Sequence, residues 1–376
     1  MTRSDNLTAV SPERVELLCD LERWADALPL VSRLLATEPE NELAWCLLAQ
    51  CQLGLGDYEA ALTAAGRAAA LAPDSEWPHR LLSFAATHLG RRDDAVRAAR
   101  EAVRLDPGAW QTHARLAAAA CRGEAGRGRL NPRARPNRAE AALAAERALA
   151  LAPDEPQVQL IYGSVAASLG RRAVAEHAYR TALQLDPQSS GAHHLLAALR
   201  LRYRVGSIGL AEAATGFATA LTADPTAQVS RHSLELTLRV FVGRAAYGLF
   251  ITAYLSQLFA VRSAPWSRAI PVLLMALPVL FVIGFLQRLT PQLRAFLRQL
   301  LRRGATAVAV WLEGLGVVLI MTGVFAPQSV RPALAGVAAI IALVARLVLY
   351  LDTRRSLRPR ARARRSRLER SGAPPS

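Results

Sequence analysis

The sequence predicts an all-α fold, in which an α-solenoid of about six helix pairs is followed by a bundle of about four transmembrane helices. Three observations lead to this prediction. Prolines recur at a fixed interval in the N-terminal part, four apolar runs follow in the C-terminal part, and the excess of arginine lies wholly in that second part. With 376 residues, of which 52% are hydrophobic, the chain is long enough for two structural units.

The interval between the prolines is 34 residues. It separates Pro39 from Pro73, Pro73 from Pro107, and Pro153 from Pro187. Each segment predicts a first helix, a turn with glycine, and a second helix that carries small residues and ends near the proline. The residues that repeat in this way are Trp45, Ala49, Gly56, Ala61, Ala65 and Ala68, then Gly90, Ala95, Ala99 and Ala102, then Gly163, Gly170, Ala175, Tyr179 and Ala182.

This pattern closely resembles the tetratricopeptide repeat family. The resemblance covers about six repeats over residues 8–225, and it implies antiparallel helix pairs stacked into a right-handed superhelix. Small residues allow the paired helices to approach closely, glycine permits the turn, and proline ends the second helix. The fourth repeat is longer than the period, and its extra residues form a predicted insertion loop at 122–137 that is rich in Gly, Arg and Pro.

The family resemblance also implies a concave groove, lined by the first helix of each pair. Trp77, Arg80 and Phe84 are of the types that dominate protein interfaces, so we expect a protein partner that presents a partly apolar helix or extended segment. The alternative is that Trp77 and Phe84 pack against the neighbouring repeat. The groove residues predicted in this way are Gln50, Leu53, Trp77, Arg80, Phe84, His88, Arg122, His194 and Arg202.

The solenoid shows no pattern typical of catalysis. It has no nucleophile with a base, no phosphate-binding loop and no set of metal ligands, so we predict a protein that is not an enzyme and needs no cofactor. His193 and His194 are adjacent, and neighbouring helical residues point about 100° apart, so structural roles are expected for both rather than metal binding. Four cysteines without a C-x-x-C spacing fit a reducing, cytosolic compartment, and no cleaved signal peptide is expected at the N-terminus.

Four apolar runs predict transmembrane helices in residues 226–351. Each is close to the ~20 residues that span a bilayer core of about 30 Å. Residues 231–376 carry 21 Arg against 4 acidic residues, and these arginines gather in the second connection and in the tail, which predicts that both termini are cytoplasmic. The protein is therefore predicted to lie in the cytoplasmic (inner) membrane, with spans at about 245–261, 269–287, 305–325 and 333–351.

Two basic segments accompany the predicted spans. Residues 291–303 have apolar residues at helical spacing with arginines between them, which predicts an amphipathic helix on the inner leaflet. The tail at 352–376, which we expect to be disordered, would attract anionic lipid. Nucleic acid is an alternative ligand for the tail, but residues 1–230 are nearly neutral, with 25 Arg against 26 acidic residues, so no nucleic-acid partner is expected.

Glu313 and Arg346 are ionisable residues inside the predicted spans. Such groups are costly in lipid, so we expect an interhelical pair, supported by small residues such as Gly314, Ala338 and Ala342. The alternative is that Glu313 titrates in a small transporter or membrane enzyme with the solenoid as its regulatory domain. The function that the sequence favours is a membrane-tethered scaffold or adaptor, for example in envelope-complex assembly or secretion.

Overall fold

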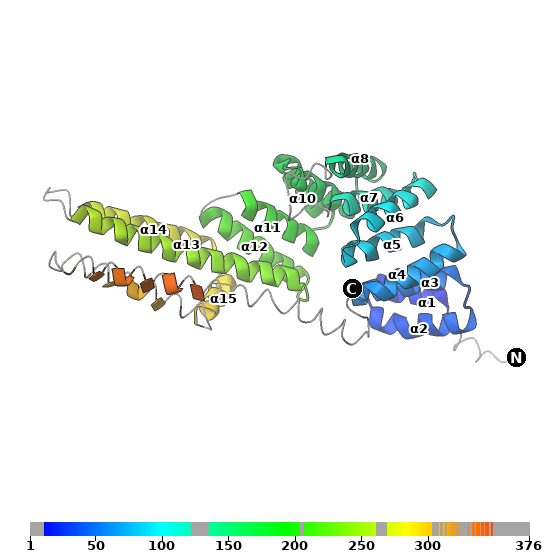
Figure 1. Cartoon of the computed structure of the whole chain (residues 1–376), viewed down its shortest axis with the longest axis horizontal. Helices are drawn as coiled ribbons and strands as arrows, with labels where there is room; N and C mark the ends of the chain where they lie inside the picture. The colour runs from blue at the N-terminus through cyan, green and yellow to red at the C-terminus, as the bar shows by residue number, and fades with distance from the viewer. Residues whose placement is uncertain are drawn as a thin grey trace. The chain divides into compact units, whose positions relative to one another are not determined.

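The structure is a computed structural model that describes residues 11–121, 135–203, 207–260 and 269–302, together with single residues and short stretches between 308 and 348. In this part of the chain every regular element is an α-helix (Figure 1). The predicted all-α fold is therefore confirmed. The helices up to residue 203 are α1(Pro12–Asp20), α2(Trp24–Thr37), α3(Glu42–Leu55), α4(Tyr58–Leu71), α5(Glu76–Leu89), α6(Arg92–Leu105), α7(Trp110–Cys121), α8(Arg135–Leu151), α9(Pro156–Ser168), α10(Arg172–Leu185) and α11(Ser190–Tyr203).

The chain forms two compact units, residues 1–195 and 196–376. The first contains five consecutive helix pairs from α1/α2 to α9/α10, in the order expected of an α-solenoid. The boundary lies within α11, so most of the sixth pair groups with the C-terminal helices. The predicted end of the solenoid at residue 225 lies beyond this boundary and stays a prediction, because the division into compact units does not show which helices are repeats.

Glycines and polar caps set the helix ends within the pairs. Gly56, Gly90 and Gly170 follow first helices with φ of 77°, 78° and 80°, in the left-handed region that glycine adopts at little steric cost. The next helix of the second repeat begins at once, because the side chain of Asp57 accepts a hydrogen bond from the Ala60 amide at 3.3 Å. Gly56 and Asp57 together therefore form the turn that the sequence predicts at this point.

A recurring hydrogen bond ties each repeat to the preceding proline. In four repeats the side chain six residues after the proline donates to the proline carbonyl. The pairs are Trp45 Nε1 with Pro39 at 2.8 Å, His113 Nε2 with Pro107 at 3.0 Å, Gln159 Nε2 with Pro153 at 2.7 Å, and His193 Nε2 with Pro187 at 3.0 Å. In the third repeat the equivalent residue is His79, and among the described residues it makes no such bond. His193 therefore has the structural role that the sequence analysis expected.

Small residues line the contacts between helices. Ala65, Ala68, Ala99 and Ala102 are completely buried. A Cβ added at Gly163 on α9 would lie 2.6 Å from Cε1 of Tyr179 on α10, far inside van der Waals contact. The tyrosine therefore packs directly on the glycine backbone, as the small-residue pattern predicted.

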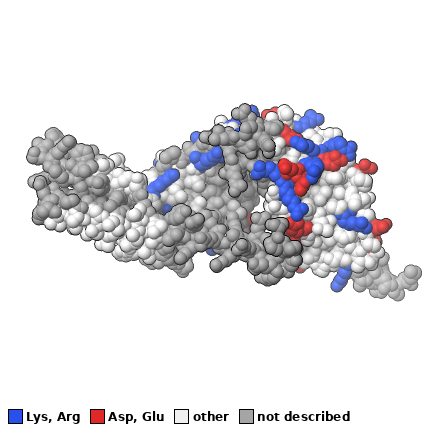
Figure 2. All heavy atoms as spheres, in the orientation of Figure 1, with Lys and Arg blue, Asp and Glu red and all other residues white. Residues whose placement is uncertain are grey.

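Ion pairs connect consecutive repeats near their second helices. Glu59 on α4 pairs with Arg91 at 3.3 Å, and Arg100 on α6 pairs with Glu140 on α8 at 2.7 Å. Farther along, Glu146 on α8 pairs with Arg171 at 3.8 Å. Five of the six side chains are 48–61% exposed, and Glu140 is 26% exposed. Figure 2 shows basic and acidic side chains intermixed over the solenoid. Positive and negative side chains therefore lie next to one another over the solenoid, in agreement with its near-neutral net charge.

The second unit contains α12(Ser207–Ala223), α13(Gln228–Ala260), α14(Ala269–Arg288) and α15(Pro291–Arg302). Phenylalanines form the centre of its core. The ring of Phe241 on α13 stacks on that of Phe285 on α14 with centroids 3.6 Å apart, and Leu210 and Phe217 of α12 are buried in the same cluster.

Over the residues that the structure describes, no helix is long and apolar enough to cross a membrane, so the predicted transmembrane bundle is not confirmed. The predicted spans at 245–261 and 269–287 coincide with parts of α13 and α14. The predicted spans at 305–325 and 333–351 are described only in part, and the tail at 352–376 lies outside the described residues. Of the predicted insertion loop at 122–137, residues 122–134 also lie outside them, whereas residues 135–137 belong to α8 and are helical.

The basic segment at 291–303 is helical over Pro291–Arg302, whereas its predicted place on the inner leaflet stays a prediction. Leu293 and Leu297 of α15 are only 4% and 3% exposed, because they pack into the core formed by α12, α13 and α14. The described part of the apolar face of this helix therefore packs on protein.

The predicted pair of Glu313 and Arg346 lies outside the described residues, and so the transporter alternative that depends on Glu313 stays a prediction. The small residues nearby are described in part. A Cβ at Gly316 would lie 3.5 Å from the carbonyl oxygen of Ala338, whereas one at Gly314 would meet nothing within 4 Å. Gly316 is therefore the glycine at this helix contact, and the sequence analysis had named Gly314.

Candidate protein-binding surface

One face of α5 carries three of the predicted groove residues. Arg80, Phe84 and His88 follow Glu76 at intervals of four, which places all four on one side of the helix. Both guanidinium nitrogens Nε and Nη2 of Arg80 donate to the carboxylate of Glu76, the second at 3.0 Å to Oε1. The guanidinium of Arg80, which the sequence predicts to bind a partner, is thus paired with Glu76 of its own helix.

Phe84 lies at the centre of a stacked group that we call the aromatic ladder, formed by Tyr58, His88, Phe84 and Arg115. The ring of His88 stacks on Phe84 with centroids 4.7 Å apart and on Tyr58 of α4 with centroids 4.4 Å apart. The guanidinium carbon of Arg115, on α7, lies 5.2 Å from the centre of the Phe84 ring, within cation–π range. Phe84 remains 38% exposed at the centre of these contacts.

The ladder joins three consecutive repeats, because Tyr58 belongs to the second, Phe84 and His88 to the third, and Arg115 to the fourth. A hydrogen bond from Arg115 Nη2 to Thr87 Oγ1 at 3.3 Å helps to hold the guanidinium in place. Tyr58 and Arg115 were not among the predicted site residues. The available signal for Tyr58 was its position directly after the Gly56-Asp57 turn, and for Arg115 its position on the first helix of the fourth repeat.

Trp77 has a different environment from Phe84. It packs against the hydrophobic clusters of the first and second repeats. For Trp77 the structure therefore agrees with the alternative of packing against a neighbouring repeat, whereas Phe84 presents its ring to solvent.

The other predicted groove residues are not brought into the ladder by any contact described. Gln50 and Leu53 are half-buried on α3, and Leu53 packs on the second-repeat cluster. His194 is half-buried on α11, where burial lowers its pKa. Arg202 is exposed near the end of α11, and Arg122 lies outside the described residues.

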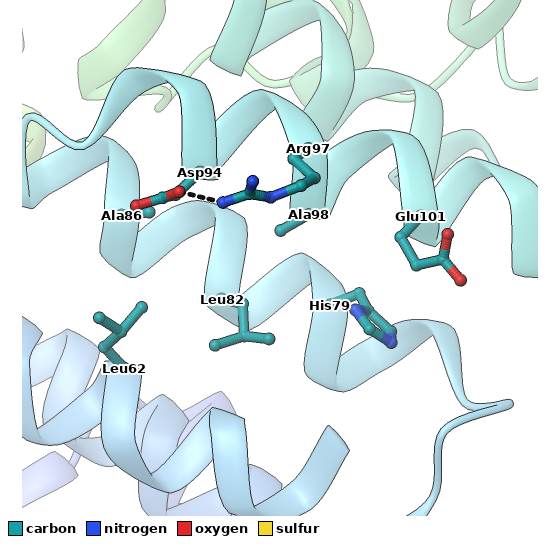
Figure 3. A pocket seen from close by; sticks show the side chains of 8 residues that line it. All are labelled: Leu62, His79, Leu82, Ala86, Asp94, Arg97, Ala98 and Glu101. Carbon is teal, nitrogen blue, oxygen red and sulfur yellow. Dashed lines mark hydrogen bonds and ion pairs between the residues drawn. The ribbon is translucent and has the colours of Figure 1, made fainter. Parts of the chain in front are cut away.

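A separate pocket of about 630 Å³ opens between α4, α5 and α6 (Figure 3). On α5 its lining residues lie roughly 150° around the helix from the ladder residues, so the pocket is on nearly the opposite face. The pocket has apolar walls and a charged edge that includes the Asp94–Arg97 ion pair. This lining suits a ligand that presents an apolar side chain next to a polar one. The lining consists of Leu62, His79, Leu82, Ala86, Asp94, Arg97, Ala98 and Glu101, none of which was predicted as a site residue.

His79 connects this pocket to the repeat pattern. It occupies the position whose side chain bonds the proline carbonyl in four other repeats, and here it lies at the pocket instead. Among the described residues, no group of three or more His, Cys, Asp or Glu side chains is arranged to hold a metal ion.

Known proteins show the same repeat. Residues 13–76 and 134–190 match the family model described as Tetratricopeptide repeat. No curated protein matches the chain.

The solved structures that match the chain include TTC0263, a thermophilic TPR protein of Thermus thermophilus, at 25% identity and a TM-score of 0.48, covering 52% of this chain and 98% of that one. YrrB, described as a TPR protein with an unusual peptide-binding site, matches at 13% identity and a TM-score of 0.34, covering 54% and 96%. MamA of Desulfovibrio magneticus RS-1 matches at 18% identity and a TM-score of 0.36, covering 50% and 96%. The two matched segments, residues 13–76 and 134–190, therefore carry repeats of the tetratricopeptide family.

Proposed function

We propose that this protein is a membrane-tethered scaffold or adaptor, without catalytic activity, that binds a segment of a partner protein on the aromatic ladder. The observation that carries the proposal is the exposed ring of Phe84, which stacks on His88 of the same helix and lies beneath the guanidinium of Arg115 from the next repeat. Aromatic and arginine side chains held in place by their neighbours lose little conformational freedom on binding, and such residues dominate interface energies.

The chemistry of the ladder favours a particular kind of segment. The rings of Phe84 and His88 offer an apolar surface, and the guanidinium of Arg115 adds a positive charge beside it. A helix or extended segment with an apolar side chain followed by an acidic one would complement both features. Arg80 contributes less, because Glu76 already neutralises it.

A displayed library of random peptides, selected on the full-length protein in detergent, tests this proposal. We expect selected peptides to share an apolar residue near an acidic one, and Phe84→Ala to weaken their binding by about tenfold or more. Val174→Ala on α10 is a matched control, because Val174 is 36% exposed, close to the 38% of Phe84. Equal loss of binding in both variants, or no loss with Phe84→Ala, would exclude the ladder as the binding surface.

Membrane tethering is supported by the apolar runs and by the exposure of apolar side chains in the second unit. Ala338 and Ala345 are buried on one side of their helix, whereas Ile340 and Leu343, roughly half a turn away, are 63% and 69% exposed. Trp311 is 80% exposed. Large apolar side chains exposed along one face favour contact with lipid.

Fractionation of cells that produce the full chain tests the tether. We expect the protein in the membrane pellet after an alkaline carbonate wash, with a C-terminal reporter active in the cytoplasm, as the positive-inside rule predicts. Release of the protein by the wash would argue for peripheral attachment. Recovery in the supernatant without any wash would exclude the tether and leave the peptide-binding proposal standing.

A further inference from the structure

Two buried thiols meet between the first helix and the second repeat. The Sγ atoms of Cys19 on α1 and Cys51 on α3 are 3.5 Å apart, although the residues are 32 positions apart in the chain. Their side chains are 2% and 0% exposed. Neither takes part in the partner-binding surface described above, and no disulfide joins them.

The surroundings of this pair are apolar. Val15, Val31 and Leu47 are buried in the same cluster, so the main polar contact of each thiol is the other thiol. The hydrogen bond between the two sulfurs lowers the pKa of Cys19 and raises the pKa of Cys51. The negative charges of Asp20 and Glu16 on α1 raise the pKa of Cys19 and so oppose this effect.

We propose that Cys19 and Cys51 form a redox-sensitive modification site, which a peroxide converts to a disulfide that links α1 to α3. The Cys19 thiol loses its proton, and the thiolate attacks one peroxide oxygen and breaks the O–O bond. The product is a sulfenic acid, and the hydroxide that leaves takes up the Cys19 proton to give one water. The Cys51 sulfur then attacks the Cys19 sulfur, the S–S bond forms, and the hydroxyl leaves as a second water with the Cys51 proton. Two thiols are oxidised by two electrons and one hydrogen peroxide is reduced.

The geometry allows this step with a small movement. A disulfide needs the sulfurs at about 2.05 Å, so they must approach by roughly 1.5 Å. α1 is 9 residues long and packs on α2 and α3, so a shift of this one short helix brings the sulfurs together.

The cross-link would fix the first repeat to the helix that carries Gln50 and Leu53, two of the predicted groove residues. A covalent loop between α1 and α3 restricts the unfolded chain, and it also prevents α1 from separating locally. Oxidation is therefore expected to protect the first helix pair from local opening.

Peptide mapping of the peroxide-treated full chain in detergent tests the proposal. After blocking of free thiols and digestion without reductant, we expect one peptide pair joined through Cys19 and Cys51, which dithiothreitol separates. Cys46 is the internal control, because it is as buried as Cys51 but makes no thiol–thiol contact within the described residues, and burial raises its pKa to about 12, so it should be recovered unoxidised. Recovery of both Cys19 and Cys51 as free thiols, or linkage of either to Cys46 or Cys121, would overturn the proposal.

Two variants separate the chemistry from the packing. Cys51→Ala removes the second sulfur, so Cys19 should stop at the sulfenic acid and be labelled by dimedone, whereas Cys46→Ala should leave the cross-link unchanged. Hydrogen exchange gives the structural readout. Peroxide should slow hydrogen exchange of the α1 amides in the parent protein but not in Cys51→Ala. If the α1 amides of the parent protein exchange equally fast with and without peroxide, the proposed protection is excluded.

Discussion

The indole of Trp24 on α2 lies directly on the backbone of Gly54 on α3. A Cβ added at Gly54 would be 2.3 Å from Cδ2 of the indole and 2.5 Å from Cε2, closer than any real Cβ contact. The contact joins the first repeat to the second. The largest of the side chains is thus accommodated by the smallest residue.

We predict that Gly54→Ala destabilises the N-terminal repeats by about 1–3 kcal/mol, because the indole must move out of a packed contact. Gly66→Ala is the matched control. Gly66 is also within a helix, and a Cβ there would meet nothing within 4 Å, so this change should be neutral or stabilising by up to about 1 kcal/mol. Urea unfolding followed by circular dichroism measures both. Equal effects of the two substitutions would show that helix propensity, and not the Trp24 contact, decides the result.

A second prediction concerns the hydrogen bonds to the proline carbonyls. His113→Ala removes the donor to the Pro107 carbonyl and should cost about 0.5–1.5 kcal/mol. His79→Ala at the equivalent position removes no such bond and should cost less. Thermal unfolding of the two variants compares them directly, and an equal or larger loss for His79→Ala would show that the hydrogen bond contributes little.

The environment of His194 predicts a dependence of stability on pH. Burial lowers its pKa from 6.5 in the folded chain. As the pH falls below about 6.5 the unfolded state therefore binds the proton before the folded state does, and stability is lost. Thermal midpoints should fall between pH 7.5 and pH 5 in the parent protein and should fall less in His194→Gln. A parallel decline in both proteins would assign the pH dependence to other groups.

The reactivity of the cysteines toward an alkylating reagent is also predictable. Burial raises the pKa of the Cys46 thiol to about 12, whereas Cys121 is only partly buried at the end of α7. Iodoacetamide at pH 8 should therefore modify Cys121 first and leave Cys46 unmodified until the chain unfolds. A time course of mass spectra on the folded protein gives the order, and early modification of Cys46 would contradict the burial described here.

The helix pairs could be predicted from the sequence because their boundaries depend on local chemistry. Gly56 and Gly90 adopt the backbone angles that their position in the repeat requires, and the spacing of Pro39 and Pro73 defined the period. The helical period also places Phe84 and His88 on one face of α5, where their rings stack, and their role in binding a partner stays a prediction.

The parts that could not be predicted depend on contacts between distant segments. Arg115 reaches Phe84 from the next repeat, and this contact depends on how the repeats stack rather than on spacing within either helix. The period of Leu293 and Leu297 identified an apolar face on α15 but could not tell whether that face meets lipid or protein. In the same way, the end of the proline period at residue 225 gave no sign that the chain divides within α11.

The ion pairs between consecutive repeats have a mechanical consequence. Three weak ion pairs link neighbouring repeats along the array: Glu59 with Arg91, Arg100 with Glu140, and Glu146 with Arg171. Each stabilises the contact between its two repeats by no more than about 1 kcal/mol, and salt weakens each of them. The buried alanine contacts do not change with salt in this way. The elastic stiffness of the array should therefore decrease as ionic strength rises, while its helical content stays constant.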